Sequence, residues 1–144
     1  IDADGKIQWK ERMIDKSFSQ PHTLAWVDVD GDGKSELITG KRYYGHNGGD
    51  PGGKEMPCLY YYDWNPKTQE FSRKTIEEGH VGCGLQIVTT DLNGDNKCDV
   101  AVAGKSGTYI LFQPQNRSLK SHCGRHNRRW MSGSARSVFA TLTK

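Results

Sequence analysis

Short segments rich in β-branched and aromatic residues recur along the chain, separated by clusters of Gly, Pro, Asn and Asp. No segment sustains the apolar repeat at positions i, i+3, i+4 and i+7 that an amphipathic helix requires. The pattern therefore predicts an all-β chain. The predicted strands cover residues 7–14, 23–28, 35–41, 58–64, 70–76, 84–90, 98–104 and 107–112, with a weaker candidate at 137–142.

The sequence contains two copies of one unit. In each copy a strand-like segment, 9–14 or 71–76, precedes a second hydrophobic segment that leads into an acidic loop. The loops begin at Asp28 and Asp91, which lie 63 positions apart, and the flanking strands repeat with them. Each unit predicts four antiparallel strands with the acidic loop between the first and the second. This arrangement is typical of a β-propeller blade.

We divide the chain into blade repeats over residues 1–115 and a basic tail over residues 116–144. Residues 22–76 are predicted to form a whole blade and residues 84–112 three strands of a second blade. Residues 1–14 are predicted to hold the outer strand of another blade, whose other strands are absent. Because propellers need four to eight blades, we expect an incomplete propeller in one chain. Its open strand edges favour a homo-oligomer or a larger assembly.

Composition and charge limit the classes of partner that are expected for this chain. Hydrophobic residues make up 34% of the chain and the mean hydropathy is −0.78, so no run approaches the roughly 18 apolar residues of a membrane span. Residues 1–115 carry 13 basic and 17 acidic residues, whereas residues 116–144 carry seven basic residues and no acidic one. Nothing in the tail indicates a nucleic-acid-binding fold, so a nucleic acid partner is not expected. The tail's segment 137–142 is instead a candidate fourth strand for the second blade.

Oxygen-bearing side chains alternate in both acidic loops. They occupy positions 1, 3, 5 and 9, and the backbone carbonyl of the Lys at position 7 offers one more oxygen. Ca²⁺ takes six to eight oxygen ligands, and three carboxylates within five residues would repel one another without a cation. The candidate Ca²⁺ ligands are Asp28, Asp30, Asp32, Lys34 and Glu36 in the first loop and Asp91, Asn93, Asp95, Lys97 and Asp99 in the second.

Two alternatives to these calcium loops exist. An EF-hand requires Glu at the twelfth loop position, where this sequence has Thr39, and it requires flanking helices rather than strands. The second alternative is that both segments are ordinary Asp/Gly turns without an ion. A bound Ca²⁺ outside an EF-hand explains the density of carboxylates better than either alternative. The simplest role for this ion is a structural one, at the turn between two strands.

The acidic loops and their hydrophobic flanks resemble the FG-GAP and VCBS repeats of calcium-binding β-propellers, over about residues 1–112. Segments 21–24, 40–43, 46–48 and 84–86 are also similar to the propeller modules of fungal aldosulose dehydratases and related sugar-processing proteins. The resemblance implies bound calcium, secretion and ligand binding on a rigid β scaffold.

Loops on the side opposite the acidic loops are candidates for ligand binding. In antiparallel sheets alternate connections emerge on one side, so the segments before each first strand and the long connection from Arg42 to Pro57 are expected to share a face. Aromatic, Arg, Asn and His side chains in such loops suit a carbohydrate or protein ligand. The candidate ligand-binding residues are His22, Arg42, Tyr43, His46, Asn47 and His80. The alternatives are a Zn²⁺ site built from His22, His46 and His80, and a flexible turn over residues 46–53.

The cysteines and a glycosylation sequon are relevant to whether the protein is secreted. The chain has four cysteines, at positions 58, 83, 98 and 123, which allow three pairings or remain as buried thiols. Asn116 begins an N-glycosylation sequon, which agrees with secretion. We therefore predict a secreted, non-enzymatic, calcium-binding propeller-repeat module for carbohydrate or protein recognition or self-assembly. The alternative is a fragment or subunit of a metal-dependent sugar dehydratase or lyase.

Overall fold

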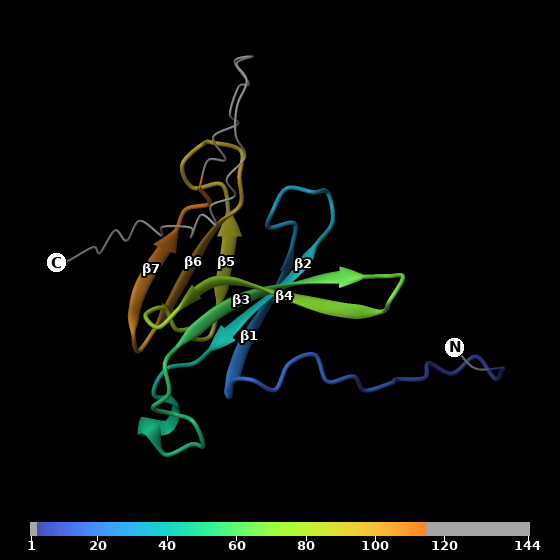
Figure 1. Cartoon of the computed structure of the whole chain (residues 1–144), viewed down its shortest axis with the longest axis horizontal. Coiled ribbons are helices and arrows are strands. Elements are labelled where there is room, and N and C mark those ends of the chain that lie inside the picture. The colour runs from blue at the N-terminus through green and yellow to red at the C-terminus, as the bar shows by residue number, and fades with distance from the viewer. Residues whose placement is uncertain (1–2, 115–144) are drawn as a thin grey trace, which may run out of the picture.

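The computed structural model describes residues 3–114 and consists of two antiparallel sheets, so the all-β prediction is confirmed (Figure 1). Sheet A contains four strands in the order β1 (Pro21–Val27), β2 (Glu36–Lys41), β3 (Cys58–Asn65) and β4 (Glu70–Glu78). Sheet B contains β5 (Ile87–Thr90), β6 (Asp99–Gly104) and β7 (Gly107–Leu111). A short 3₁₀ helix, η1 (Gly45–Gly48), lies in the connection between β2 and β3.

Within each sheet every strand pairs with the next one along the chain. The turn between β3 and β4 illustrates how local chemistry fixes the register. The side chain of Asn65 accepts hydrogen bonds from the backbone N–H groups of Lys67 (3.0 Å) and Thr68 (3.4 Å), and Gln69 takes the left-handed conformation at φ 56°. This turn aligns Asn65 with Glu70 and so places alternate side chains of both strands on one face.

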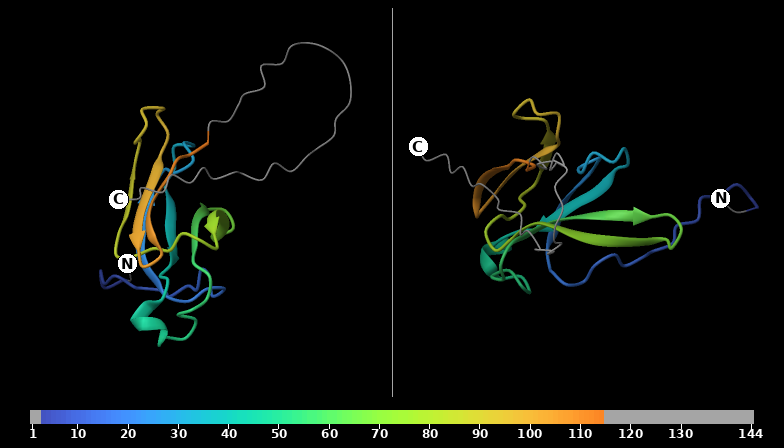
Figure 2. Two further views of the ribbon diagram at one scale, coloured as in Figure 1. Left: turned by 90° about the vertical axis from the view of Figure 1, so that its left-hand side faces the viewer. Right: turned by 45° about the horizontal axis from the view of Figure 1, so that its top comes forward.

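The main core lies between the two sheets. Ile38 and Leu59 of sheet A are fully buried, as are Val100 and Val102 of sheet B apart from 4% and 3% of their surface. Val81, in the segment that links the sheets, is buried in the same cluster. Strands β1 and β5 lie next to each other where the sheets meet (Figures 1 and 2). Each such buried side chain contributes about 1.5–3 kcal/mol, so this face-to-face packing holds the two sheets together.

A second cluster covers part of the other face of sheet A. Cys58, Tyr60 and Tyr62 are buried there. The N-terminal segment packs on them: the ring of Phe18 lies 5.5 Å from that of Tyr60, and Asp15 accepts a hydrogen bond of 2.9 Å from the Tyr62 hydroxyl. The strands of sheet A thus have apolar side chains on both faces, unlike strands with one solvated face.

The strand prediction is wrong at residues 7–14. The structure assigns no strand to residues 6–16, because no strand of the described residues lies beside them to supply the backbone hydrogen bonds that define one. Strand β5 is also shorter than predicted and begins at Ile87 rather than at residue 84. The predicted strand at 137–142, the basic tail, Asn116 and Cys123 lie outside the described residues.

Cys58, Cys83 and Cys98 carry free thiols. Burial raises the pKa of Cys83 to about 12, so this thiol stays protonated at neutral pH. Across residues 3–114, no helix has the length and apolar character needed to cross a lipid bilayer.

Candidate metal centre

Asp28 organises the first acidic loop, which connects β1 to β2. Its carboxylate accepts three backbone hydrogen bonds, from Gly31 (2.7 Å), Asp32 (3.1 Å) and Gly33 (2.9 Å). Gly31 and Gly33 have φ values of 81° and 86°, a left-handed conformation that glycine adopts without steric cost. The sequence folds this way because a short carboxylate followed by glycines lets the backbone wrap around the side chain.

Glu36 closes the loop at the first residue of β2. This residue is only 3% exposed, and its carboxylate accepts a 2.9 Å hydrogen bond from the backbone N–H of Val29. Burial raises the pKa of Glu36, and the negative charges of Asp30 and Asp32 raise it further. The charged form of this buried carboxylate is therefore destabilised, and a nearby cation would stabilise it.

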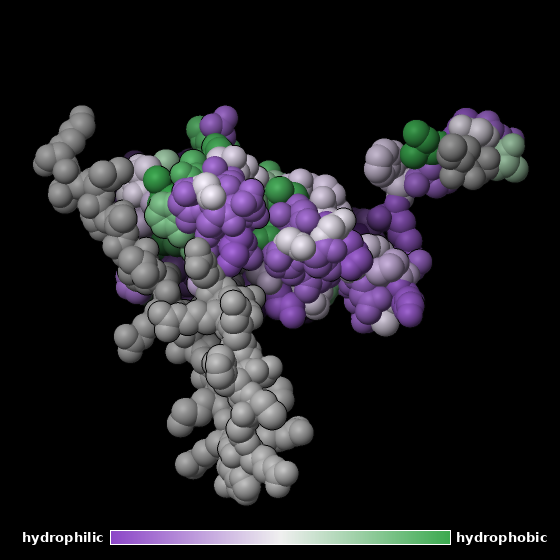
Figure 3. All heavy atoms as spheres, turned by 90° about the horizontal axis from the view of Figure 1, so that it is seen from above, coloured by the Kyte–Doolittle hydropathy of each residue, from purple (hydrophilic) through white to green (hydrophobic). Residues whose placement is uncertain are grey.

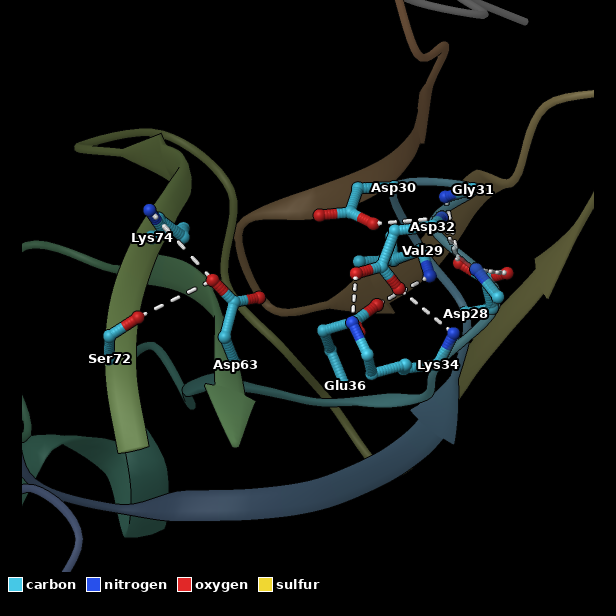
Figure 4. Close-up of polar contacts among 11 residues, drawn as sticks. Asp28, Val29, Asp30, Gly31, Asp32, Lys34, Glu36, Asp63, Ser72 and Lys74 are labelled. Carbon is cyan, nitrogen blue, oxygen red and sulfur yellow. Dashed lines mark hydrogen bonds and ion pairs between the residues drawn. The ribbon is translucent and has the colours of Figure 1, made fainter. Parts of the chain in front are cut away.

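Three carboxylates of this loop converge. One oxygen each from Asp28, Asp30 and Glu36 lies within 4.8 Å of the other two (Figure 4). Asp32 is engaged differently: its carboxylate accepts hydrogen bonds from the Lys34 ammonium (2.8 Å) and the Lys34 backbone N–H (2.9 Å), which lower the pKa of Asp32. The predicted ligands Asp28, Asp30 and Glu36 are thus brought together, whereas the side chain of Asp32 is turned to Lys34.

The second loop, between β5 and β6, repeats the backbone hydrogen bonds of the first loop to its leading Asp. Asp91 accepts from the backbone N–H groups of Gly94 (2.7 Å), Asp95 (3.2 Å) and Asn96 (2.8 Å), and these bonds lower the pKa of Asp91. Asn96 takes the left-handed conformation, φ 63°, at the position of Gly33. Asn93 stands at the position of Asp30 and makes the second loop less negative.

Asp99 is the counterpart of Glu36 and is completely buried. It accepts hydrogen bonds from the N–H of Leu92 (2.9 Å), as Glu36 does from Val29, and also from the N–H of Gln113 (3.0 Å) beyond β7. Gln113 was not among the residues predicted for the site. Its contact spans 14 positions and leaves no local signal in the sequence.

The donor set of the first loop fits Ca²⁺. All donors are hard oxygens, which Ca²⁺ prefers at 2.3–2.6 Å. Two ligands on opposite sides of such an ion are about 5 Å apart, so three oxygens within 4.8 Å of one another can share it. Among the described residues this is the one group of three or more His, Cys, Asp or Glu side chains with ligand atoms that close.

The opposite side of the sheets brings a different set of loops together. The Lys105 ammonium donates to the Tyr44 carbonyl (3.0 Å) and to the Asn47 side chain (3.1 Å), and it lies 5.5 Å from the centre of the Tyr44 ring. His46 lies 2.7 Å from the Asp50 carboxylate in the same connection. Sequence reasoning missed Lys105, although the alternation of connections in an antiparallel sheet places its turn on this side.

The other predicted ligand-binding residues are spread along that side. Arg42 and Tyr43 are half-buried at the end of β2, and the Arg42 backbone N–H donates to the Gln20 carbonyl (3.0 Å). His22 is exposed on β1, and the His80 ring lies 3.0 Å from the buried carboxylate of Glu77. The structure does not group His22, His46 and His80 as metal ligands, because strand β1 and the two loops hold them apart.

Residues 21–54 match the FG-GAP repeat. The match includes β1, the first acidic loop, β2 and η1. No curated protein and no solved structure matches the chain. FG-GAP repeats are β-propeller blades, and the two antiparallel sheets of the described residues have the architecture of such blades.

Proposed function

We propose that this chain is a calcium-binding propeller-repeat module in which Ca²⁺ fixes the connection between the first two strands of each blade. The observation that supports the proposal most strongly is the convergence of Asp28, Asp30 and Glu36 at the start of β2. The matching hydrogen bonds of the second loop support the same role for Asp91, Asn93 and Asp99. Bound Ca²⁺ would supply the positive charge that these oxygens lack.

The chain's own residues prepare both loops before any ion binds. Asp28 and Asp91 each hold three backbone N–H groups, so the loop backbone is already wound around one carboxylate. Glu36 and Asp99 anchor the far ends of the loops to buried positions in β2 and β6. A loop held at both ends loses less conformational entropy on binding, which favours affinity.

We further propose that the loops on the opposite side bind a carbohydrate or protein ligand in the extracellular space, without catalysis. The Tyr44 ring, the Lys105 ammonium and the exposed His46 combine aromatic area with polar groups, which is typical of such a surface. Calcium loops of extracellular modules commonly bind at about 10⁻⁴–10⁻³ M, a range that suits secreted proteins. The sequon at Asn116 supports the same compartment.

Titration calorimetry of the calcium-free protein with CaCl₂ tests the metal part of the proposal. We expect heat from calcium binding, and we expect Asp30→Asn to weaken it at the first loop. Asp63→Asn is the matched control, because Asp63 lies on neighbouring β3 outside the converging group and is paired with Lys74 at 3.8 Å (Figure 4). Absence of heat in the unaltered protein, or equal loss in both variants, would contradict the proposal.

A further inference from the structure

A pocket of about 430 Å³ lies at the end of sheet A away from the acidic loops. Three segments line it: residues 17–18 before β1, residues 55–57 of the β2–β3 connection, and residues 78–79 at the end of β4. Residues of β2 and β3 line it as well. The volume falls within the range of about 300–1,000 Å³ that small-molecule sites occupy.

Lys41, the last residue of β2, brings a buried charge to the lining of this pocket. The residue is only 1% exposed; its ammonium donates to Ser19 Oγ at 2.7 Å, and the Glu55 carboxylate lies 3.7 Å away. An ammonium has three N–H donors, and a buried charge is costly unless it is paired and hydrogen-bonded. Within residues 3–114, Ser19 accepts from one of the three. The other two donors favour a ligand that brings acceptor atoms.

The backbone at Gly52 is shaped to keep two oxygens beside Lys41. Gly52 has a φ of 71°, and a Cβ built there would lie 2.6 Å from Glu55 Oε2 and closer still to Ser19 Oγ. Any other residue would displace both oxygens. The Arg42 backbone N–H donates to the Gln20 carbonyl (3.0 Å), which ties the connection to the segment before β1. The fold thus holds the ammonium and its neighbours in defined positions.

Two carboxylates and an apolar wall complete the pocket. Glu78 accepts a 2.6 Å hydrogen bond from the Tyr60 hydroxyl, and a carboxylate has about four lone pairs, so Glu78 keeps acceptor capacity. The Glu55 side chain is 65% exposed and therefore reachable from solvent. Phe18, whose ring lies 5.5 Å from that of Tyr60, and Met56 supply apolar atoms. The pocket presents donors, acceptors and apolar surface together.

The charge balance of the lining restricts the class of ligand. The charged residues that line the pocket are one ammonium, Lys41, and two carboxylates, Glu55 and Glu78. An anionic ligand would be repelled by both carboxylates, and a cationic ligand would be repelled by the buried ammonium. A neutral hydroxyl group suits both, because its oxygen accepts a hydrogen bond while its O–H donates one. Adjacent hydroxyl groups on a carbon ring match this arrangement.

We propose that this pocket binds one neutral sugar residue, whose adjacent hydroxyl groups accept from the Lys41 ammonium and donate to the carboxylates of Glu55 and Glu78. The carbon face of the sugar then packs against Phe18. Hydrogen bonds to charged groups are stronger than those between neutral groups, so three such groups favour binding. This inference rests on the proposed carbohydrate ligand and gives it a site distinct from the surface around Tyr44 and Lys105.

The pocket and the candidate metal centre lie at opposite ends of β2. Glu36 is the first residue of this strand and Lys41 the last. Hydrophilic side chains cover much of the surface seen from the side of the acidic loops (Figure 3). The pocket instead lies beside the β2–β3 connection, at the other end of the strands in Figure 1. Calcium and sugar therefore share no ligand, and their binding can be measured separately.

Saturation-transfer NMR of the full chain tests the inference, with the methyl glycosides of glucose, galactose, mannose and xylose as neutral probes. At least one is expected to give a signal, and glucuronate and glycine, as charged probes, are expected to give weaker ones. Lys41→Met is expected to abolish the signal in a folded protein, because an apolar chain of similar length replaces a buried charge. Lys54→Met, at an exposed lysine of the same connection outside the pocket, is the matched control and is expected to keep it.

Glu78→Gln provides a second variant, at an exposed residue, that decides the matter if Lys41→Met does not fold. It is expected to weaken binding about 5- to 10-fold, because an amide acceptor replaces a charged one. Unchanged binding in this variant, or equal loss in Lys54→Met, overturns the inference.

Three further results overturn the inference: no signal from any neutral glycoside, a stronger signal from glucuronate or glycine, and a sugar signal that survives Lys41→Met but disappears with Lys105→Met. The last result would leave the proposed carbohydrate function standing at the surface around Tyr44. Calcium calorimetry on the same samples reports on the metal centre independently.

Discussion

Two buried carboxylates, Glu36 and Asp99, determine how the acidic loops join their sheets. Each sits at the first residue of a strand and accepts the backbone N–H that follows the loop's first Asp. Glu36 has three neighbouring carboxylates in its loop and a raised pKa, whereas Asp99 satisfies two backbone donors in a less negative loop. Under the proposed calcium binding, the first loop is therefore expected to depend more on the cation and the second more on backbone hydrogen bonds.

Asp99→Ala is expected to destabilise the fold by about 1–3 kcal/mol, because it removes the acceptor of the part-buried N–H groups of Leu92 and Gln113. Urea unfolding measures the change. Asp95→Ala in the same loop serves as the control, since Asp95 accepts one bond, from the Lys97 N–H (3.1 Å), near the surface. Equal losses in both variants would argue against the role assigned to Asp99.

The effect of Glu36→Gln on folding stability is expected to change sign when calcium is present. The raised pKa means that the folded protein holds this proton at pH values where the unfolded chain has lost it, so stability from Glu36 falls as pH rises above about 4.5. Without calcium at pH 7, the neutral Gln is therefore expected to be at least as stable as Glu. With calcium it is expected to be less stable, which melting in both conditions measures; destabilisation in both would be the contrary result.

The pKa of Asp15 is shifted in the opposite direction from that of Glu36. Burial raises its pKa, but hydrogen bonds from Ser17, Tyr62 and Arg73 outweigh burial and lower the pKa from 3.8 to about 2. The charged form is favoured in the folded state, so its stabilisation, roughly 2 kcal/mol, is present above pH 3.8 and is lost as pH falls toward 2. Asp15→Asn is expected to reduce stability at pH 7 and to flatten its fall between pH 4 and 2.

At the scale of elements, strands β2 and β3 approach closely where Gly40 faces Leu59. A Cβ at Gly40 would lie 2.3 Å from the Cys58 carbonyl and 2.7 Å from the Cys83 sulfur. Gly40→Ala is therefore expected to cost about 1–3 kcal/mol in denaturant unfolding. Gly49→Ala, in an exposed loop at an ordinary φ of −78°, is expected to cost less; the reverse order would contradict this packing.

Elements that depend on local pattern were predictable from the sequence. The seven strands of the described residues follow segments rich in β-branched and aromatic residues, and the acidic loops follow the spacing of Asp28 and Asp91. Residues 7–14 have the same pattern but form no strand, because a strand requires a neighbour and the pattern does not reveal one. Contacts such as Lys105 with Asn47 and Asp99 with Gln113 join segments that only the folded sheets bring together.

At the scale of the whole molecule, one packed interface joins two sheets and leaves both outer faces partly apolar. The side with the acidic loops and the side with the β2–β3 connection are separated by the length of the strands, as Figure 1 shows. Calcium at one side and a ligand at the other would then act independently, with the sheets as the rigid part between them. The repeat predicted this separation, since alternate connections of an antiparallel sheet emerge at opposite ends.

The most direct test of calcium binding is the melting temperature of the unaltered protein in millimolar Ca²⁺, in chelator, and in Mg²⁺ at the same ionic strength. At 1 mM Ca²⁺, an ion that binds only the folded state with a Kd of about 10⁻⁴ M adds about 1.4 kcal/mol for each loop. For a chain of this size we predict a rise of roughly 5 °C or more with Ca²⁺ and a smaller one with Mg²⁺. Identical melting in all three buffers would mean that the acidic loops are ordinary turns.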